Sequence, residues 1–482
     1  MAKAPIPEEL EVGKIITLTP ERVAHGGSFV ARAHDRVIFV RHTAIGEKVR
    51  ARITGVGAKN RFFFADTVEV LEPSEHRRPH PWAPADALAQ ESPLGGMEFG
   101  HLNPDYQREL KTQVVREQLE RLGGLPADFA LLRLLRVEAL SEEDLGWRTR
   151  VHFAVSPAGR VAMHPHSSAE TREVEDFPLA HETLRKLNLS QLDLTGAVRL
   201  DATVSSTGEI LLVFAVSTGE SVESVARKIT EQAGSAWGDF TAQNITLHFT
   251  EERVGGRRRG QRQPDLTRGA QSERPTVTEE LDADGARLRW KVGAGGFWQI
   301  HPQAPAALTA TVAEMLELSA GETVFDLYSG AGLFTAMAAA EVGAKGSVLA
   351  VEGSAVTSAN ARENFASGLA RIKESKKTPV EVVRSDVGAH LEKILPSVAS
   401  GRLGRPSAVI LDPSREGAGK KVMEQCNQLA PSRIVYVACD PAALGRDTGY
   451  LRQMGWEITA LRAFDMYPNT HHVETVALFE KR

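Results

Sequence analysis

From about residue 306 onward, short runs of apolar and β-branched residues alternate with segments of helix length. This alternation constrains the fold more than any other feature, because parallel strands need a crossover between them. The runs typical of buried strands are 324–326, 348–352, 380–383, 409–412 and 434–437. We therefore expect a parallel α/β sheet with helices on both faces. Two later runs, 456–464 and 473–479, lie too close together for a crossover helix, so we expect a closing antiparallel hairpin.

The N-terminal part of the chain has a different pattern. Between about residues 10 and 72, short alternating runs are separated by turn residues, which is typical of a small OB-like β-barrel. A helical pattern follows at 105–122, and residues 147–250 have mainly the strand pattern. The domains that we predict are an OB-like barrel over 1–72, an α+β central domain with a linker over 73–275, and an α/β domain over 276–482.

Composition excludes several classes of protein. No stretch approaches the ~20 apolar residues of a membrane helix, and an apolar signal segment is lacking, so we expect a cytoplasmic protein with no membrane partner. Two cysteines are too few for an internal four-thiolate metal or iron–sulfur site. The net charge of −5 argues against a globally basic nucleic-acid binder, although a local basic face would suffice for binding.

Residues 251–274 hold seven arginines and four acids. This segment is either a solvated insertion or an arm that contacts phosphates.

A glycine-containing loop follows the first strand of the expected α/β domain. Gly330 and Gly332 precede a helix pattern, so the backbone there can approach a ligand closely. Glu352 ends the next strand and suits both hydroxyls of an adenosine ribose. The third glycine of a dinucleotide fingerprint is replaced by Thr335, and the shorter loop fits S-adenosylmethionine, which has no pyrophosphate. Asp386, after the third strand, either meets the adenine edge or simply ends a strand at the surface.

Two further strand ends carry reactive groups. Asp412-Pro413 follows the fourth strand, where a stiff turn would hold a carboxylate at the ligand-binding edge, and Arg415 is close behind. Cys439 ends the fifth strand, and a thiolate there is a good nucleophile toward an electron-poor ring carbon. The alternative is a small buried hydrophobe, which is the role we expect for Cys426.

Glu474 begins the last apolar run, so desolvation should disfavour its charged form and make it a stronger base. The alternative is an edge-strand glutamate that faces water. The preceding His471-His472 pair is not expected to bind metal, because adjacent strand residues diverge and a third ligand is not evident. Gln299 offers a donor and an acceptor for a uracil edge or the cofactor.

Together, these segments resemble the RNA (uracil-C5) methyltransferase family, which makes 5-methyluridine. The segments that look like its motifs, in chain order, are 296–299 (part of G-x-F-x-Q-x-N, with His301 where Asn is common), 325–332 (D-L-Y-C-G-x-G, with Ser329 for Cys), 412–415 (D-P-P-R, here Asp-Pro-Ser-Arg), 438–441 (S-C-N-P, here Ala-Cys-Asp-Pro) and 465–474 (D-x-F-P-x-T-x-H-V-E, with Tyr467 for Phe). The N-terminal segments 26–30 and 40–49 resemble the TRAM domain of RNA-modifying enzymes. The resemblance covers essentially the whole chain.

The resemblance implies a class I methyltransferase (Rossmann-like) domain behind an RNA-binding TRAM barrel. It implies that Cys439 attacks uracil C6 and that Glu474 removes the C5 proton. The residues that would bind S-adenosylmethionine or frame the site are Gln299, Tyr328, Glu352, Asp386 and Asp412. The RNA partner would be large-subunit (23S) ribosomal RNA in preference to transfer RNA, with the target base out of its stack. We expect a monomer.

One departure from the family pattern is clear. Many ribosomal members hold an iron–sulfur cluster, but Trp82, Leu94 and Met97 stand where three of its cysteines would be, and the fourth is lost near Phe177. We therefore predict no cluster and expect apolar packing in its place. Three alternatives stay open at this point. They are a non-catalytic RNA-binding protein on the same scaffold, a nucleotide-dependent oxidoreductase, and a DNA methyltransferase, although cytosine enzymes usually have Pro where Ala438 precedes Cys439.

Overall fold

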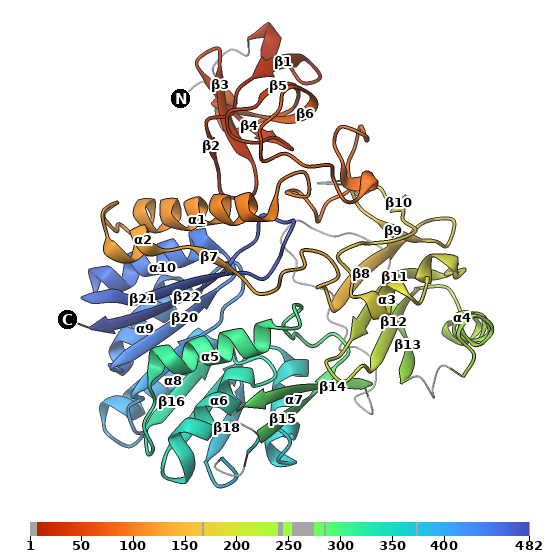
Figure 1. The fold of residues 1–482 in the computed structure, drawn as a ribbon. Helices are drawn as coiled ribbons and strands as arrows, with labels where there is room; N and C mark the ends of the chain where they lie inside the picture. Colours follow the sequence, from red (N-terminus) through yellow and green to blue (C-terminus); the bar gives the residue numbers. More distant parts are fainter. Residues whose placement is uncertain are drawn as a thin grey trace.

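The computed structural model describes residues 7–165, 168–239, 244–252, 274–283, 286–372 and 375–481. Three groups of elements are seen in Figure 1. A small barrel stands at the top, a large sheet covered by helices lies below it, and a second sheet stands to the side. The arginine-rich stretch singled out in the sequence falls almost wholly on 253–273, outside the described residues.

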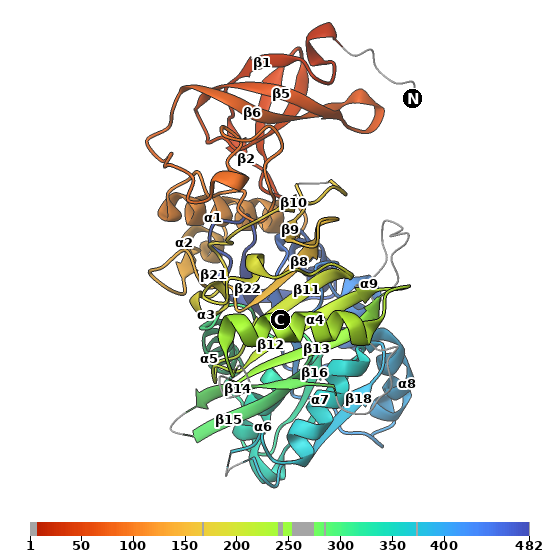
Figure 2. The same cartoon turned by 90° about the vertical axis from the view of Figure 1, so that its right-hand side faces the viewer.

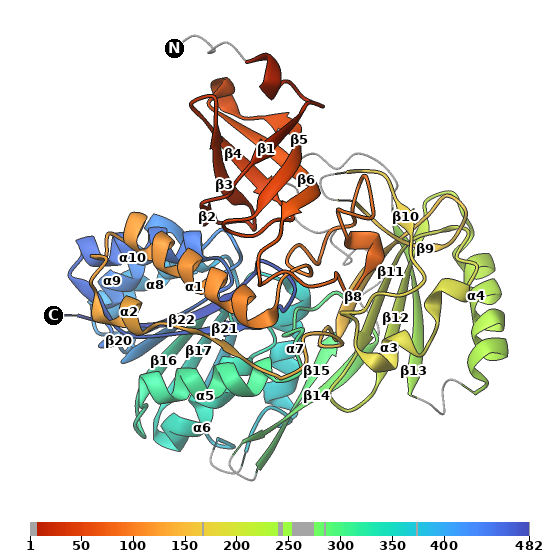
Figure 3. The same cartoon turned by 45° about the horizontal axis from the view of Figure 1, so that its top comes forward.

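The barrel has six strands in the order β1-β5-β6-β4-β3-β2 (Figure 3). Their bounds are β1 Ile15–Leu18, β2 Arg22–Val23, β3 Phe29–Ala33, β4 Arg36–Arg41, β5 Lys48–Val56 and β6 Phe62–Glu72. Alternate residues of these strands point inward and form one hydrophobic cluster that includes Ile38, Val40 and Phe63. This is the barrel that the alternating N-terminal pattern predicts.

The second sheet has the order β10-β9-β8-β11-β12-β13. Its strands are β8 Arg150–Val155, β9 Val161–Met163, β10 Arg172–Glu173, β11 Ala197–Val204, β12 Ile210–Ser217 and β13 Ile245–Glu252, with the short helix α3 Glu182–Arg185 beside it. Helix α4 (Val222–Trp237) lies across β13 in Figure 2 and was not predicted. Its buried residues Val225, Ile229 and Ala233 recur every fourth position, so a helical period was present in the sequence.

The large sheet has eight strands in the order β18-β17-β16-β19-β20-β22-β21-β7. Its strands are β16 Thr323–Leu327, β17 Ser347–Glu352, β18 Val380–Arg384, β19 Ala408–Leu411, β20 Arg433–Ala438, β21 Trp456–Asp465 and β22 Glu474–Lys481, with β7 Val137–Ala139 at one edge. Strands β16 to β20 are parallel, whereas β22 runs antiparallel to both β20 and β21. The predicted parallel sheet and its closing hairpin are therefore confirmed.

Helices cover both faces of this sheet (Figure 1). They are α5 Ala304–Leu316, α6 Leu333–Val342, α7 Ala355–Ala366, α8 Val387–Ala399, α9 Gly419–Leu429 and α10 Pro441–Gln453. A two-stranded sheet, β14 (Thr276–Ala283) and β15 (Ala286–Gly293), packs against α7. None of the described helices is long and apolar enough to cross a membrane.

Two elements from the expected central segment belong with the large sheet. Strand β7 pairs in parallel with β21, and helix α1 (Pro104–Arg121) packs along α10. The helices approach so closely that a Cβ at Gly445 would lie 2.6 Å from the carbonyl oxygen of Gln118. The division at 72/73 and 275/276 stays a prediction, but residues 104–139 pack with the C-terminal unit, which the sequence pattern did not anticipate.

The region where an iron–sulfur cluster would lie is filled by hydrophobic side chains. Trp82, Leu94, Met97 and Phe177 are all buried in one cluster. The rings of Trp82 and Phe177 lie 5.3 Å apart between centroids. Apolar packing therefore holds this region together, as expected, and the lack of a metal cluster stays a prediction.

Candidate active site at the carboxyl edge of the large sheet

The loop after β16 has the backbone shape of a ligand cradle. Tyr328, Gly330 and Gly332 all have positive φ angles, of 65°, 56° and 95°. A Cβ at Gly332 would come within 2.7 Å of the Phe365 ring, so this position requires glycine. Helix α6 begins immediately afterwards, and its first backbone N–H groups point toward the loop without a side-chain cap among the described residues.

Three carboxylates from neighbouring strand ends surround this loop. Glu352 accepts hydrogen bonds from the backbone N–H of Gly330 (2.9 Å) and of Ser354 (2.6 Å). Burial, then the charges of Asp326 and Glu352, raise the pKa of Asp412 to about 7. Burial likewise raises the pKa of Asp326 to about 7, with a smaller contribution from the charge of Glu352, although Thr335 donates a hydrogen bond to Asp326. Asp326 Oδ1 has no hydrogen-bond partner among the described residues.

This arrangement fits a cationic adenosyl cofactor. A positive ligand would relieve the mutual repulsion of the three carboxylates, and an unpartnered buried carboxylate oxygen is costly unless a donor or cation meets it. Asp326 lies within the loop motif 325–332, but the sequence alone indicated no role for it. Its signal was a charged residue inside an otherwise apolar strand.

For the other residues that were predicted to bind the cofactor, the structure gives less direct support. The side chain of Asp386 accepts a hydrogen bond from the backbone N–H of Ala389 (3.0 Å) and so caps helix α8. Gln299 is buried after β15, and burial raises the pKa of the Tyr328 phenol. Contact of these three side chains with a cofactor stays a prediction.

Cys439 and Glu474 face each other across two adjacent strands. The antiparallel register pairs Ala438 of β20 with Thr475 of β22, so the next residue on each strand, Cys439 and Glu474, is also opposed. Burial, then the charges of Glu474 and Asp412, raise the pKa of the Cys439 thiol to about 12, while Arg415 opposes this shift. The two reactive groups predicted from separate motifs therefore lie together at one edge of the sheet.

Glu474 is enclosed by the protein. Its side chain is 3% exposed, and burial and the charge of Asp412 raise its pKa well above the usual range, as expected from the apolar run that it begins. The Tyr467 hydroxyl donates a hydrogen bond to Glu474 Oε2 at 3.3 Å. A carboxylate in this environment is a strong base once it is ionised.

The two histidines before Glu474 are engaged by protein groups. His472 Nε2 lies 3.3 Å from Arg415 Nη2, and burial, then the charges of His471 and Arg415, lower the His472 pKa to about 3. His471 Nδ1 lies 3.7 Å from a carboxylate oxygen of Glu98. Within the described ranges, no cluster of three or more His, Cys, Asp or Glu is placed to hold a metal.

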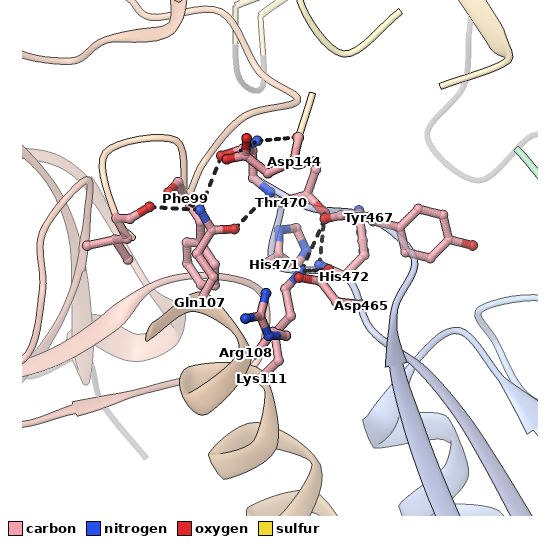
Figure 4. Close-up of polar contacts among 12 residues, drawn as sticks. Phe99, Gln107, Arg108, Lys111, Asp144, Asp465, Tyr467, Thr470, His471 and His472 are labelled. Atoms are coloured by element: carbon pink, nitrogen blue, oxygen red, sulfur yellow. Dashed lines mark hydrogen bonds and ion pairs between the residues drawn. The ribbon is translucent and has the colours of Figure 1, made fainter. Parts of the chain in front are cut away.

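Helix α1 anchors the loop that carries these groups (Figure 4). Lys111 Nζ donates to Asp465 Oδ1 at 2.6 Å and to the carbonyl oxygen of Tyr467 at 3.1 Å. The Gln107 side chain donates to Asn469 Oδ1 (3.1 Å) and accepts from the Asn469 backbone N–H (2.8 Å). These residues could not be predicted from the sequence, because no local pattern links α1 to a loop more than 350 positions away.

Comparisons with known proteins show the family to which the chain belongs. A family model described as tRNA (Uracil-5-)-methyltransferase matches residues 266–482. An uncharacterized RNA methyltransferase of Streptomyces avermitilis is 35% identical over 468 residues, which cover 95% of this chain and 96% of the relative. The chain belongs to the RNA (uracil-C5) methyltransferase family. As a member of that family it is an S-adenosylmethionine-dependent enzyme.

Two further proteins are similar to this chain over nearly its whole length. The 23S rRNA (uracil(1939)-C(5))-methyltransferase RlmD of Pseudomonas fluorescens is 29% identical over 478 residues, which cover 98% of this chain and 95% of that protein. The crystal structure of the Pyrococcus abyssi tRNA (uracil-54, C5)-methyltransferase in complex with S-adenosyl-L-homocysteine superposes with a TM-score of 0.63 at 19% identity, over 98% of this chain and 100% of that chain. This likeness confirms the predicted class I methyltransferase fold.

Proposed function

We propose that this enzyme methylates C5 of a uridine in structured RNA, with large-subunit ribosomal RNA as its substrate, through a covalent intermediate on Cys439. The observation that carries the proposal is the opposition of Cys439 and Glu474 beside the carboxylate-lined loop. S-adenosylmethionine supplies an electrophilic methyl group when bound. The loop after β16 and the side chains of Asp326, Glu352 and Asp412 would hold it.

Cys439 makes C5 reactive. Uracil C5 is a weak nucleophile, but addition of the Cys439 thiolate to C6 moves the ring electrons onto O4 and C5 as an enolate. The thiol must lose its proton first, and Arg415 is the cation whose field favours the thiolate. The new bond is C6–Sγ. The enolate carbon C5 would then bond to the methyl group as the methyl–sulfur bond breaks, with S-adenosylhomocysteine as the leaving group.

Glu474 completes the turnover. After methylation, C5 carries both a methyl group and its original proton, and Glu474 removes that proton. The C–H electron pair re-forms the C5–C6 double bond, the C6–Sγ bond breaks, and Cys439 leaves as a thiolate. The buried position of Glu474 makes its ionised form unusually basic, and Arg415 also favours that ionised form.

The choice of RNA rests on the N-terminal barrel and on a relative. The barrel segment resembles the TRAM domain, and the relative from Pseudomonas fluorescens named for 23S rRNA matches nearly the whole chain. The Pyrococcus abyssi enzyme, which shares the fold, is named for transfer RNA. Transfer RNA is therefore the second candidate substrate.

A methyl-transfer assay tests the proposal. The protein is incubated with methyl-labelled S-adenosylmethionine and unmodified ribosomal RNA or transfer RNA, and nucleosides are identified by mass spectrometry. Label in 5-methyluridine from ribosomal RNA that disappears with Cys439→Ala supports the proposal. Label from transfer RNA alone overturns the substrate and keeps the chemistry. RNA binding without label in either RNA would indicate a non-catalytic RNA-binding protein.

A further inference from the structure

The turn between β2 and β3 brings the barrel to the catalytic edge. His25 Nε2 lies 2.8 Å from Asp440 Oδ2, and Asp440 directly follows Cys439. Asp440 also accepts a hydrogen bond from the backbone N–H of Ala443 and so caps α10. Figure 1 shows the lower end of the barrel next to α1 and to the C-terminal loop, which joins β21 to β22. The barrel therefore contacts the element that presents the proposed nucleophile.

Gly27, later in the same turn, packs closely against His471. A Cβ at Gly27 would lie 2.8 Å from the Cβ of His471, and Gly27 has a φ of 81°. Only glycine satisfies both requirements without a shift of the backbone. At Gly26, by contrast, a Cβ would meet no described atom within 4 Å, so the backbone of this residue faces open space.

A cavity of about 100 Å³ lies between the turn and the sheet edge. Residues 24–27 form its barrel side, and Cys439, Arg415 and His472 line the catalytic side. Arg415 is exposed, and His25 is 39% exposed, so both can meet a ligand. Of the described residues that line the cavity, Asp440 is the acid, and its carboxylate already pairs with His25.

We propose that the turn at residues 24–27 is one wall of the site that receives the target nucleotide, with His25 and Arg415 beside its phosphodiester backbone. The inference rests on the proposed function, because the nucleotide must place its base on Cys439. An RNA strand carries a phosphate on each side of an extruded base. Cationic or N–H donor groups that lie near the base bind these phosphates. The barrel is then a part of the catalytic site and not only a tether for RNA.

The test uses the full-length protein and ribosomal RNA transcribed with 5-fluorouridine in place of uridine. Fluorine at C5 cannot leave as a proton, so the methylated Cys439–RNA adduct persists and migrates as a slow band on a denaturing gel. Adduct formation is timed at saturating RNA with S-adenosylmethionine present, for wild type, His25→Ala and Asp440→Asn. His34→Ala is the matched control, because His34 is an exposed histidine of the same barrel at a different turn.

We expect His25→Ala to slow adduct formation at saturating RNA by about tenfold or more, the usual effect of losing one charge-assisted contact. We expect His34→Ala to match wild type. Adding Asp440→Asn to His25→Ala should cost less than the product of the single effects, because the two side chains interact. Melting temperature and cofactor affinity measured on each variant identify a folding defect.

Two results would overturn the inference. One is a higher KM for RNA with an unchanged rate at saturation, which is the behaviour of a tether. The other is an equal effect of His25→Ala and His34→Ala. Absence of an adduct with wild type would instead contradict the proposed covalent mechanism itself, and the inference would fall with it.

Discussion

Lys111 Nζ lies 2.6 Å from Asp465 Oδ1, and both side chains are almost completely shielded from solvent. Asp465 ends β21 at the start of the loop that leads to Glu474, so this buried pair fixes one end of the loop to helix α1. Burial lowers the pKa of Lys111, while Asp465 counteracts that shift. A buried pair of this kind contributes less by its attraction than by the cost of leaving either partner alone.

Substitution of Lys111 by Met should therefore destabilise the protein strongly. It leaves the Asp465 carboxylate buried without its cation, which costs about 3–5 kcal/mol. Urea unfolding of the two proteins measures the difference. Lys421→Met is the control, because Lys421 pairs with Glu392 at the exposed surface, where loss of the pair leaves no charge buried and should change stability little. Equal losses for the two variants would contradict this account.

Gln107→Met should uncouple the two halves of the reaction. It removes two of the hydrogen bonds that hold Asn469, which lies in the left-handed region (φ 67°) within the loop before Glu474. If the proposed roles hold, Cys439 still adds to the base, whereas proton removal by a displaced Glu474 slows by about tenfold or more.

The measurement is the amount of covalent enzyme–RNA adduct with ordinary uridine RNA in the steady state. Gln107→Met should accumulate the adduct, as Glu474→Gln should. Gln113→Met, at an exposed position of the same helix, should not. A variant that loses adduct and turnover in parallel would show a general loss of folding in place of a displaced base.

The reactivity of Cys439 should rise steeply with pH. Because its pKa is raised to about 12, the thiol form dominates at neutral pH, and the thiolate fraction grows about tenfold per pH unit until that pKa is reached. Iodoacetamide labelling, followed by mass spectrometry of the peptide, should show this slope without a plateau near pH 8.5. Arg415→Gln removes a cation that favours the thiolate, so it should slow labelling further. A plateau below about pH 9 would contradict the pKa shift.

The strands of the large sheet could be predicted from sequence because each is a continuous apolar run. Strand β7 could not, since its three residues become a strand by pairing with β21 far along the chain. The same reason hid Lys111 and Gln107, whose partners lie in the C-terminal loop. Cys439, Glu474 and the glycine loop could be singled out from the sequence because each lies in a short local motif. Their closeness in space depends on the order of the strands, which the motifs do not contain.

Cofactor binding should strengthen as pH rises through about 7. Asp326 and Asp412 have pKa values raised from 3.8 to about 7, so the folded protein holds more protons than the unfolded chain between those values. Its stability therefore falls as pH rises from about 4 to about 7 and changes little from this source above 7. A cation favours the ionised carboxylates, so binding of S-adenosylmethionine releases protons near neutral pH. Calorimetry at about pH 6 and about pH 8 should show tighter binding at the higher value.

Two comparisons isolate the carboxylates as the cause. S-adenosylhomocysteine lacks the sulfonium charge, so its affinity should depend less on pH. Asp412→Asn should flatten the dependence for S-adenosylmethionine, whereas Asp386→Asn should leave the slope unchanged, because that carboxylate caps α8 at the surface. If the two ligands showed the same slope, the carboxylates would not be sensing the sulfonium, and the placement of the methyl donor beside Asp326 and Asp412 would have to be abandoned.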